Sequence, residues 1–435
     1  MGLGSLSEAP SELRDIAARP YFRSLASDDL IAIVSADRPN APTLFAADLF
    51  FPVMVIKKGP LERNIAKMAT WCRNQGVLLA PHAKTTMAPQ IVALQLAAGA
   101  WGISVATISQ ARVFRQFGVD HILLANELVD RAGIDWLRRE RQQDSSFDFF
   151  CYVDSKDGVQ LLSEGMGETS ARRLSVLVEM GVAHGRAGCR TPAQVLDIAR
   201  AVAATPNLEL RGIAGYEGAV THDVSPEGLA AVRRYCRLLR EATDRVQSAG
   251  MFPRDAGLRI ISLGGSAFFD VVVSSLAEWA SGAGLTVILR SGAYVSHDVG
   301  IYRALSPFGS RISEVEPFEP ALELWGDVLS RPEANLAIVG VGRRDTSWDE
   351  GYPVPTLVRH RGDPLPSGLV GWVVSKLNDQ HAFLYASAAR PSGGLEIGDK
   401  VGFGISHPCT AFDRWQLMPM VDDGYGVVNL VRTFF

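Results

Sequence analysis

The stretch Leu78-Leu79-Ala80-Pro81-His82-Ala83-Lys84-Thr85-Thr86 predicts how the folded core of this 435-residue chain begins. A short apolar run, typical of a strand, ends in a polar cluster with Lys84 at its tip, and a helical pattern follows over 88–98. A lysine at a strand end is a candidate for covalent chemistry, because a buried lysine loses its charge and becomes a nucleophilic amine. The alternative is an ordinary solvated lysine.

The rest of the first 300 residues repeats this alternation of strand and helix. With 77–80 counted first, strand patterns occupy eight segments: 77–80, 101–105, 121–125, 147–153, 174–180, 208–214, 258–263 and 285–289. Helical patterns at 61–71, 88–98, 109–117, 132–141, 195–203 and 226–248 accompany them. Eight such units predict an α/β fold, a parallel (β/α)₈ TIM barrel. The count, and the lack of an early Gly-x-Gly-x-x-Gly turn, favour the barrel over a doubly wound open sheet.

After Pro307 the pattern changes to short β-rich runs between Gly, Pro and Asp turns, at 335–341, 368–375, 382–386, 400–405 and 424–431. The segment 42–57 also looks extended. We therefore expect an N-terminal extension over 1–56 that partly packs with a β domain, a barrel over 57–307, and a C-terminal antiparallel β domain over 308–435.

The composition is that of a soluble globular enzyme, with 47% hydrophobic and 21% charged residues. The net charge of −4 argues against a nucleic-acid partner, and no apolar run approaches the ~20 residues that span a bilayer. Five scattered cysteines and no recognisable secretory signal favour a reducing, cytoplasmic location.

The predicted ends of strands seven and eight carry glycine-rich turns. Gly264-Gly265-Ser266 follows the seventh strand, and Arg290-Ser291-Gly292-Ala293-Tyr294 comes at the end of the eighth. A barrel of this kind commonly binds phosphate there. We expect backbone N–H groups of the glycines, with the Ser266 and Tyr294 hydroxyls, to hold a phosphate. Two ordinary glycine turns are the alternative.

Other strand ends also present polar residues. Arg186, in His184-Gly185-Arg186-Ala187-Gly188, could hold a phenolate or carboxylate, and Tyr216, in Gly215-Tyr216-Glu217-Gly218, could contact a cofactor ring. Asn126 follows the third strand. Taken singly, such residues are also common parts of turns.

Ser406-His407-Pro408-Cys409 ends the predicted strand 400–405. In an extended chain His407 and Cys409 would project to the same side, and Pro408 favours an extended His407. Imidazole and thiolate together suit Zn²⁺, and two protein ligands would leave positions open for water or substrate. A buried cysteine beside a loop histidine is the alternative.

From about Phe51 to Asp422 these motifs resemble the fold-type III pyridoxal phosphate enzymes, which have an alanine racemase-type barrel, and within them the branch of D-serine dehydratase and D-threonine aldolase. Pro81-His82-Ala83-Lys84-Thr85 and Gly99-Ala100-Trp101-Gly102 resemble its Schiff-base lysine region, and His407-Pro408-Cys409-Thr410 the metal motif of the dehydratases. The branch commonly has glutamine where Arg290 stands, and the loop Gly342-Arg343-Arg344-Asp345-Thr346-Ser347-Trp348 also departs from it.

The resemblance implies pyridoxal 5′-phosphate on Lys84 and a divalent metal, expected to be Zn²⁺, at His407 and Cys409. The expected contacts of the cofactor are His82, Lys84, Arg186, Tyr216, Gly264, Gly265, Ser266, Arg290, Gly292 and Tyr294. It also implies a homodimer that dehydrates a D-amino acid with a β-hydroxyl to a 2-oxo acid and ammonia. Aldolases of the branch usually carry aspartate at the position of Cys409, which favours the dehydratase. Retro-aldol cleavage, racemisation and a non-enzymatic cofactor carrier remain alternatives.

Overall fold

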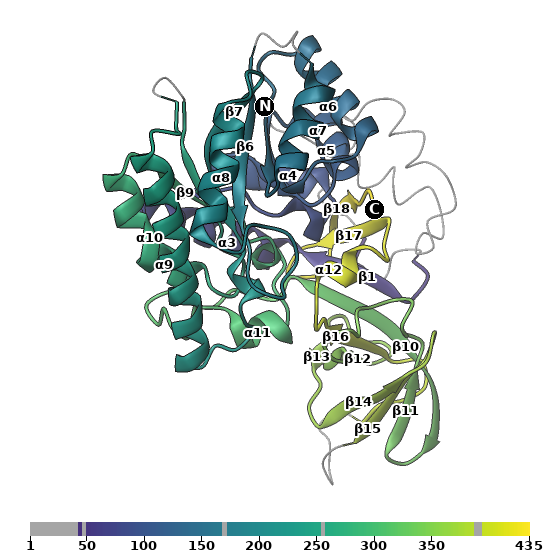
Figure 1. Ribbon diagram of the computed structural model, residues 1–435. Coiled ribbons are helices and arrows are strands. Elements are labelled where there is room, and N and C mark those ends of the chain that lie inside the picture. Colours follow the sequence, from purple (N-terminus) through teal and green to yellow (C-terminus); the bar gives the residue numbers. More distant parts are fainter. Residues whose placement is uncertain (1–41, 46–48, 168–171, 254–256, 387–393) are drawn as a thin grey trace.

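Eight parallel strands form one sheet in the order β2-β9-β8-β7-β6-β5-β4-β3 (Figure 1). They are β2 (Leu78–Leu79), β3 (Ile103–Val105), β4 (His121–Glu127), β5 (Asp148–Val153), β6 (Leu174–Met180), β7 (Leu208–Gly215), β8 (Ile260–Ser262) and β9 (Thr286–Leu289). Each corresponds to one predicted strand. The sheet is closed between its first and last strands by a parallel bridge between His82 and Ser104, with the Ser104 N–H donating to the Pro81 carbonyl at 3.0 Å. The predicted barrel is confirmed.

The barrel strands are continuous apolar runs because they are buried on both faces. One set of alternating residues fills the interior as a separate cluster that includes Leu123, Phe150, Leu177 and Ile260. The neighbouring residues on each strand point outward and pack under the helices. The polar groups at the strand ends therefore stand above a filled core rather than an open channel.

Helices cover the outside of the barrel (Figure 1). They are α3 (Lys58–Asn74), α4 (Pro89–Ala97), α5 (Ile108–Gln116), α6 (Arg131–Gln143), α7 (Lys156–Met166), α8 (Pro192–Ala203), α9 (Pro226–Ser248) and α10 (Phe269–Gly282), with the short α11 (Ile301–Leu305) following β9. The predicted helical ranges are all present, and α7 and α10 are additional. Several begin with a capping hydroxyl: Thr107, Thr191 and Ser225 each accept a hydrogen bond from the backbone three residues on.

The second sheet is mostly antiparallel. Its strands are β1 (Val53–Lys57), β10 (Leu322–Glu333), β11 (Leu336–Val339), β12 (Val354–Arg359), β13 (Ser367–Gly368), β14 (Trp372–Leu377), β15 (Ala382–Ala386), β16 (Lys400–Gly404), β17 (Leu417–Val421) and β18 (Val427–Arg432). The strand β1 from the N-terminal segment lies between β10 and β17, as expected for residues 42–57. The strands β10, β12 and β17 were not predicted.

The end of β16 runs beside the segment that follows β9. The Val299 N–H donates to the Ile405 carbonyl at 2.9 Å, and the Ile301 N–H donates to the Ser406 carbonyl at 3.2 Å. Gly300 is required at this contact, because a Cβ there would stand 2.6 Å from the Ser406 oxygen. This pairing brings residue 407 to the mouth of the barrel.

The computed structural model describes residues 42–45, 49–167, 172–253, 257–386 and 394–435. The greater part of the expected N-terminal extension, 1–41 and 46–48, therefore lies outside the described residues. Among the described helices, none combines the length and the apolar character needed to cross a membrane.

Candidate active site

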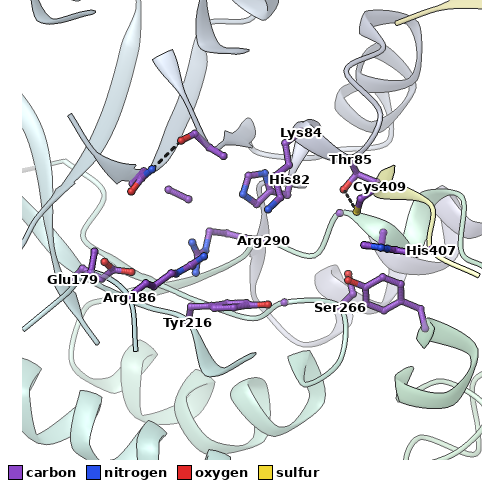
Figure 2. A pocket seen from close by; sticks show the side chains of 18 residues that line it. His82, Lys84, Thr85, Glu179, Arg186, Tyr216, Ser266, Arg290, His407 and Cys409 are labelled. Carbon is purple, nitrogen blue, oxygen red and sulfur yellow. Dashed lines mark hydrogen bonds between the residues drawn. The ribbon is translucent and has the colours of Figure 1, made fainter. Parts of the chain in front are cut away.

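A cavity of about 340 Å³ opens at the carboxyl ends of the barrel strands, a volume in the range of small-molecule cofactor sites. Ten of the twelve predicted site residues line it: His82, Lys84, Arg186, Tyr216, Gly265, Ser266, Arg290, Gly292, His407 and Cys409. Figure 2 shows Lys84 and His82 on one side and Tyr216 on the opposite side, with Arg290 between them. Glu179 and Arg186 lie at one end, and His407 and Cys409 at the other.

Lys84 stands on a 3₁₀ turn (Ala83–Thr85) directly after the barrel-closing residue His82. Burial lowers the pKa of Lys84, the neighbouring Cys409 raises it, and Arg186 and Arg290 lower it further, with a net lowering. Burial also holds the pKa of His82 well below 6.5, and His82 Nδ1 has no hydrogen-bond partner in the structure. The pocket thus contains a lysine biased toward the neutral amine beside a neutral imidazole.

Arg186 lies with its guanidinium 4.6 Å from the ring centroid of Tyr216. Hydrogen bonds fix the turn that carries Arg186. The Arg190 guanidinium donates to the carbonyls of Gly185 (3.1 Å), Ala187 (3.1 Å) and Gly188 (2.7 Å). The cation and the phenol are therefore held together at the rim of the cavity.

Arg290 is buried, with only 6% of its surface exposed. One of its terminal nitrogens donates to the Tyr152 hydroxyl at 2.7 Å and the other to the Gly215 carbonyl, while Nε has no partner among the described residues. A buried guanidinium with an unused donor at the centre of a pocket is costly unless a ligand accepts from it. Arg290, where the resemblance implies a glutamine, is thus part of this pocket.

Three groups predicted to hold a phosphate have partners inside the protein instead. The N–H groups of Gly264 and Gly265 donate instead to the buried Glu217 carboxylate, at 3.0 and 2.5 Å, and Gly264 is not among the described residues that line the cavity. The Tyr294 hydroxyl accepts from Gln95 Nε2 at 2.9 Å and is buried under the barrel wall. The sequence could not reveal these two internal partners.

Several residues of the two glycine-rich turns do reach the cavity. Gly265, Ser266, Gly292 and Ala293 line it. Gly292 has a second reason to be glycine, because a Cβ there would stand 2.6 Å from the His82 carbonyl oxygen. Asn126, which lies within β4 rather than after it, also lines the cavity, and its amide donates to the Ala106 carbonyl at 3.1 Å.

An acidic pair lies beside the arginine end of the cavity. Glu179, near the end of β6, is buried and lines it, and Glu127 ends β4. Burial, together with the charges of Glu179 and Asp154, raises the pKa of Glu127 to about 8. The pair therefore retains a proton at neutral pH.

His407 and Cys409 meet, but not through an extended chain. Pro408 has helical dihedrals (φ −70°, ψ −34°), and Cys409 begins the short helix α12 (Cys409–Phe412), so the predicted local geometry was wrong. Burial lowers the pKa of His407, but the Cys409 thiol and the Asp349 carboxylate outweigh it and raise the value to about 9. The two side chains therefore meet across a helical turn. The sequence had predicted the same contact from the two-residue repeat of a strand.

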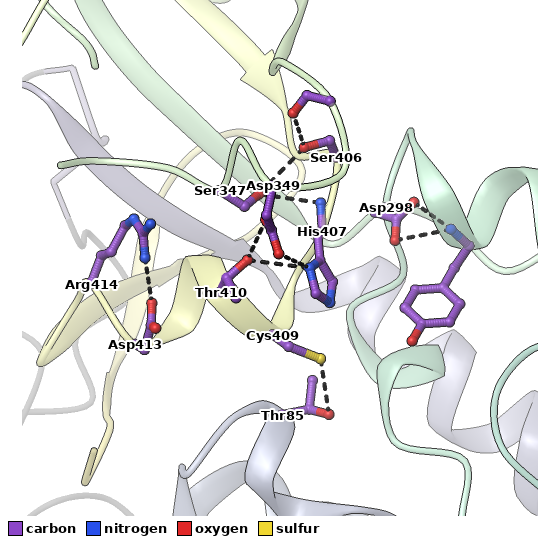
Figure 3. A network of polar contacts seen from close by, with 12 residues as sticks. Thr85, Asp298, Ser347, Asp349, Ser406, His407, Cys409, Thr410, Asp413 and Arg414 are labelled. Atoms are coloured by element: carbon purple, nitrogen blue, oxygen red, sulfur yellow. Dashed lines mark hydrogen bonds and ion pairs between the residues drawn. The ribbon is translucent and has the colours of Figure 1, made fainter. Parts of the chain in front are cut away.

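A carboxylate orients the imidazole (Figure 3). Asp349 Oδ2 lies 2.7 Å from His407 Nδ1, and the Thr410 hydroxyl donates to Asp349 Oδ1 at 2.8 Å. With Nδ1 engaged, His407 Nε2 is the nitrogen left for a ligand. Cys409 Sγ lies 3.5 Å from Thr85 Oγ1, which places the thiol next to the lysine turn.

These residues fit the two groups implied by the resemblance. The unpartnered His82 Nδ1 and Arg290 Nε, the amine of Lys84 and the cation at Arg186 suit an anionic aromatic cofactor. An imidazole oriented by a carboxylate, next to a thiol, suits zinc. Among the described residues, no group of three or more His, Cys, Asp or Glu side chains is placed to hold a metal ion, so His407 and Cys409 are the two candidate ligands.

Two family models match the chain in these same regions. The alanine racemase N-terminal domain model matches residues 56–270, and the model described as "Putative serine dehydratase domain" matches residues 321–421. The chain belongs to the fold-type III pyridoxal phosphate enzymes. Within that family, it falls in the branch of the D-serine dehydratases and D-threonine aldolases.

Curated relatives agree with this placement. A 3-hydroxy-D-aspartate aldolase of Paracoccus denitrificans (strain Pd 1222) is 29% identical over 322 residues, which cover 74% of this chain and 79% of the relative. A D-threonine aldolase of Arthrobacter sp. is 28% identical, covering 92% and 96%. A D-threo-3-hydroxyaspartate dehydratase of Delftia sp. (strain HT23) is 27% identical, covering 79% and 85%.

The fold itself is shared with solved structures. The crystal structure of D-threonine aldolase from Filomicrobium marinum superimposes with a TM-score of 0.75 at 24% identity, covering 92% of this chain and 98% of that one. Both sheets of the present chain are therefore part of a known architecture.

Sequence reasoning missed three residues of the site. Glu179 had a signal, since it is a charged residue inside the otherwise apolar run 174–180. Tyr302 lines the cavity and Asp349 orients His407, but both lie in segments without a clear periodic pattern. Their positions depend on the docking of the second sheet.

Proposed function

We propose that this protein is a pyridoxal phosphate- and metal-dependent lyase that dehydrates a D-amino acid with a β-hydroxyl group to a 2-oxo acid and ammonia. The observation that carries the proposal is that His407 and Cys409, from the second sheet, line the same cavity as Lys84. An amine that can exchange a proton at Cα and a ligand pair that can act on the β-oxygen then face one substrate.

In this proposal Lys84 would hold the cofactor, and its Nζ would accept the α-proton of the substrate. Burial lowers the pKa of Lys84, and this suits a base of this kind because it favours the free amine. Pyridoxal phosphate, when bound, supplies an acceptor for the electrons left at Cα. Arg186, Tyr216 and Arg290 would hold the ring of the cofactor, and Ser266 and Gly292, which line the same cavity, would hold its phosphate.

At the other end, His407 and Cys409 would hold the metal, with Asp349 fixing the imidazole. Zinc bound there supplies Lewis acidity toward a β-hydroxyl, which is a poor leaving group on its own. Thr85 lies beside both the thiol and Lys84, which keeps the two ends of the site in a fixed relation.

The second candidate is retro-aldol cleavage between Cα and Cβ. Two of the curated relatives carry aldolase names and one carries a dehydratase name, so the relatives do not choose between the reactions. The match of residues 321–421 to the serine dehydratase model and the thiol at Cys409 favour dehydration. A homodimer in the cytoplasm belongs to the same proposal, and sedimentation analysis tests the dimer.

Product analysis tests the proposal. The metal-loaded holoenzyme is incubated separately with D-serine, D-threonine and D-threo-3-hydroxyaspartate. We expect a 2-oxo acid and ammonia in equal amounts from at least one of them. Glycine and an aldehyde as the only products would establish the aldolase, and formation of the L-enantiomer alone would establish a racemase.

A further inference from the structure

Tyr302 is a tyrosine of the cavity that neither the sequence motifs nor the proposed function uses. It stands on α11, close to the metal-motif end, with its ring centroid 6.5 Å from that of His407. Tyr302 lines the same cavity as Cys409 and Tyr216. It therefore lies at the end of the cavity that carries His407 and Cys409.

The hydroxyl of Tyr302 is free, unlike those of the tyrosines that serve the core. The hydroxyls of Tyr152, Tyr235, Tyr294 and Tyr425 are each hydrogen-bonded, to Arg290, Met180, Gln95 and Glu323 respectively. Within the described residues, the Tyr302 hydroxyl makes no hydrogen bond, and Tyr302 lines the cavity. A tyrosine hydroxyl that is half-buried without a partner has its donor available for a ligand.

The backbone around Tyr302 is fixed, so the ring position does not depend on the hydroxyl. The buried Asp298 carboxylate accepts from the N–H groups of Gly300 (2.8 Å) and Tyr302 (3.0 Å). The same segment is paired to Ile405 and Ser406, directly before His407. Tyr302 and His407 are thus held by one docked unit, and a loss of the phenol oxygen leaves that unit intact.

We propose that the Tyr302 hydroxyl donates a hydrogen bond to the β-oxygen of the substrate, and so helps this oxygen to leave. The inference rests on the proposed function, because it assigns the β-oxygen to the end of the cavity that holds His407 and Cys409. The proposal adds a substrate-binding residue, from the segment that follows β9, to the two proposed metal ligands of the second sheet.

The experiment compares two substrates in each variant. D-serine has a β-oxygen, whereas β-chloro-D-alanine has the same α-carboxylate and amine but loses chloride, which needs no such hydrogen bond. In Tyr302→Phe we expect kcat/KM for D-serine to fall about tenfold, as for one neutral hydrogen bond, with the value for β-chloro-D-alanine within about twofold of wild type. Both substrates are measured on the same preparation, so the ratio of their two kcat/KM values does not change when part of the sample is unfolded.

Two further variants distinguish the loss of the hydroxyl from a loss of packing around the ring. Tyr302→Leu, which also removes the ring, should change the ratio as much as Tyr302→Phe. Tyr385→Phe, on β15 in the second sheet, is the matched control and should leave both substrates unchanged. Equal losses on both substrates in Tyr302→Phe, or no loss on either, would overturn the proposal.

The proposed function can fail separately. If wild-type enzyme yields only glycine and an aldehyde, dehydration is wrong, and the same variants are measured on the cleavage of D-threonine. The contact with the β-oxygen then predicts the same tenfold loss in Tyr302→Phe, while the spectral shift on binding D-alanine keeps its wild-type midpoint. Undiminished cleavage in Tyr302→Phe would overturn the assignment of the hydroxyl.

Discussion

Lys84 has two arginines as neighbours, and these cations help to make its amine reactive. We expect purified protein to be yellow and Lys84→Ala to lose both the colour and all activity, because the attachment point of the cofactor and the base are removed together. Lys376→Ala, on the exposed face of β14, is the matched control. Borohydride reduction followed by peptide mapping checks the attachment, and a label on any other lysine would contradict it.

Arg186 and Ser266 both line the cavity, but they differ in charge. A hydrogen bond to a charged group contributes about 1.5–3 kcal/mol and a neutral one about 0.5–1.5 kcal/mol. We therefore expect Arg186→Ala to weaken cofactor binding or turnover about tenfold or more, and Ser266→Ala to have a milder effect. Titration of the apoprotein with pyridoxal phosphate measures both. Unchanged affinity and turnover in Arg186→Ala would remove this residue from the site.

The raised pKa of Glu127 should make the stability of the folded protein depend on pH. The folded state raises its pKa from 4.5 to about 8, so the folded state binds more protons than the unfolded state between these values. Stability should fall as the pH rises from about 4.5 to 8. Glu127→Gln removes this dependence and should be more stable than wild type by more than about 1 kcal/mol at pH 8, with little difference near pH 4.5. Urea unfolding at the two pH values measures this, and equal differences at both would contradict it.

At the scale of elements, the pairing of residues 299–301 with 405–406 decides where the metal motif lies. We expect Gly300→Ala to push Ser406 away, because the new Cβ would stand 2.6 Å from a backbone oxygen that cannot rotate aside. Thermal stability and metal content should both fall. Gly282→Ala is the control, since nothing lies within 4 Å of a Cβ at that end of α10. Wild-type metal content in Gly300→Ala would show that the motif is held by other contacts.

At the scale of the molecule, residues from both sheets line the candidate site, and the two proposed metal ligands, His407 and Cys409, come from the second sheet. We expect about one zinc per subunit and loss of β-elimination after chelation, with the absorption of the cofactor retained. Cys409→Ala should behave like the chelated enzyme, and Cys409→Asp should keep a metal and shift products toward aldol cleavage. Metal analysis with activity after dialysis decides this. Full activity in a verified metal-free sample would make His407 and Cys409 structural residues.

The parts that were predictable depend on local patterns. The eight barrel strands follow from buried apolar runs, and Lys84, Arg186 and Tyr216 follow because parallel strands bring their ends to one edge. The strands β10, β12 and β17 were harder to predict from the sequence, because their buried and exposed residues do not alternate regularly. The cysteine and histidine were expected together for a wrong local reason, since a helical turn joins them.

The sequence by itself determined the barrel, the lysine at the end of its first strand and the family, because these depend on periodicity and on contiguous motifs. Only the tertiary structure decided the partners of the side chains. The N–H groups of Gly264 and Gly265 donate to Glu217, and the Tyr294 hydroxyl accepts from Gln95. Among the described residues, the Tyr302 hydroxyl has no hydrogen-bond partner, and its ring lies near His407. The physical reason is that most buried donors take an acceptor that is near in space, and residues distant in the chain become neighbours only when the elements pack together.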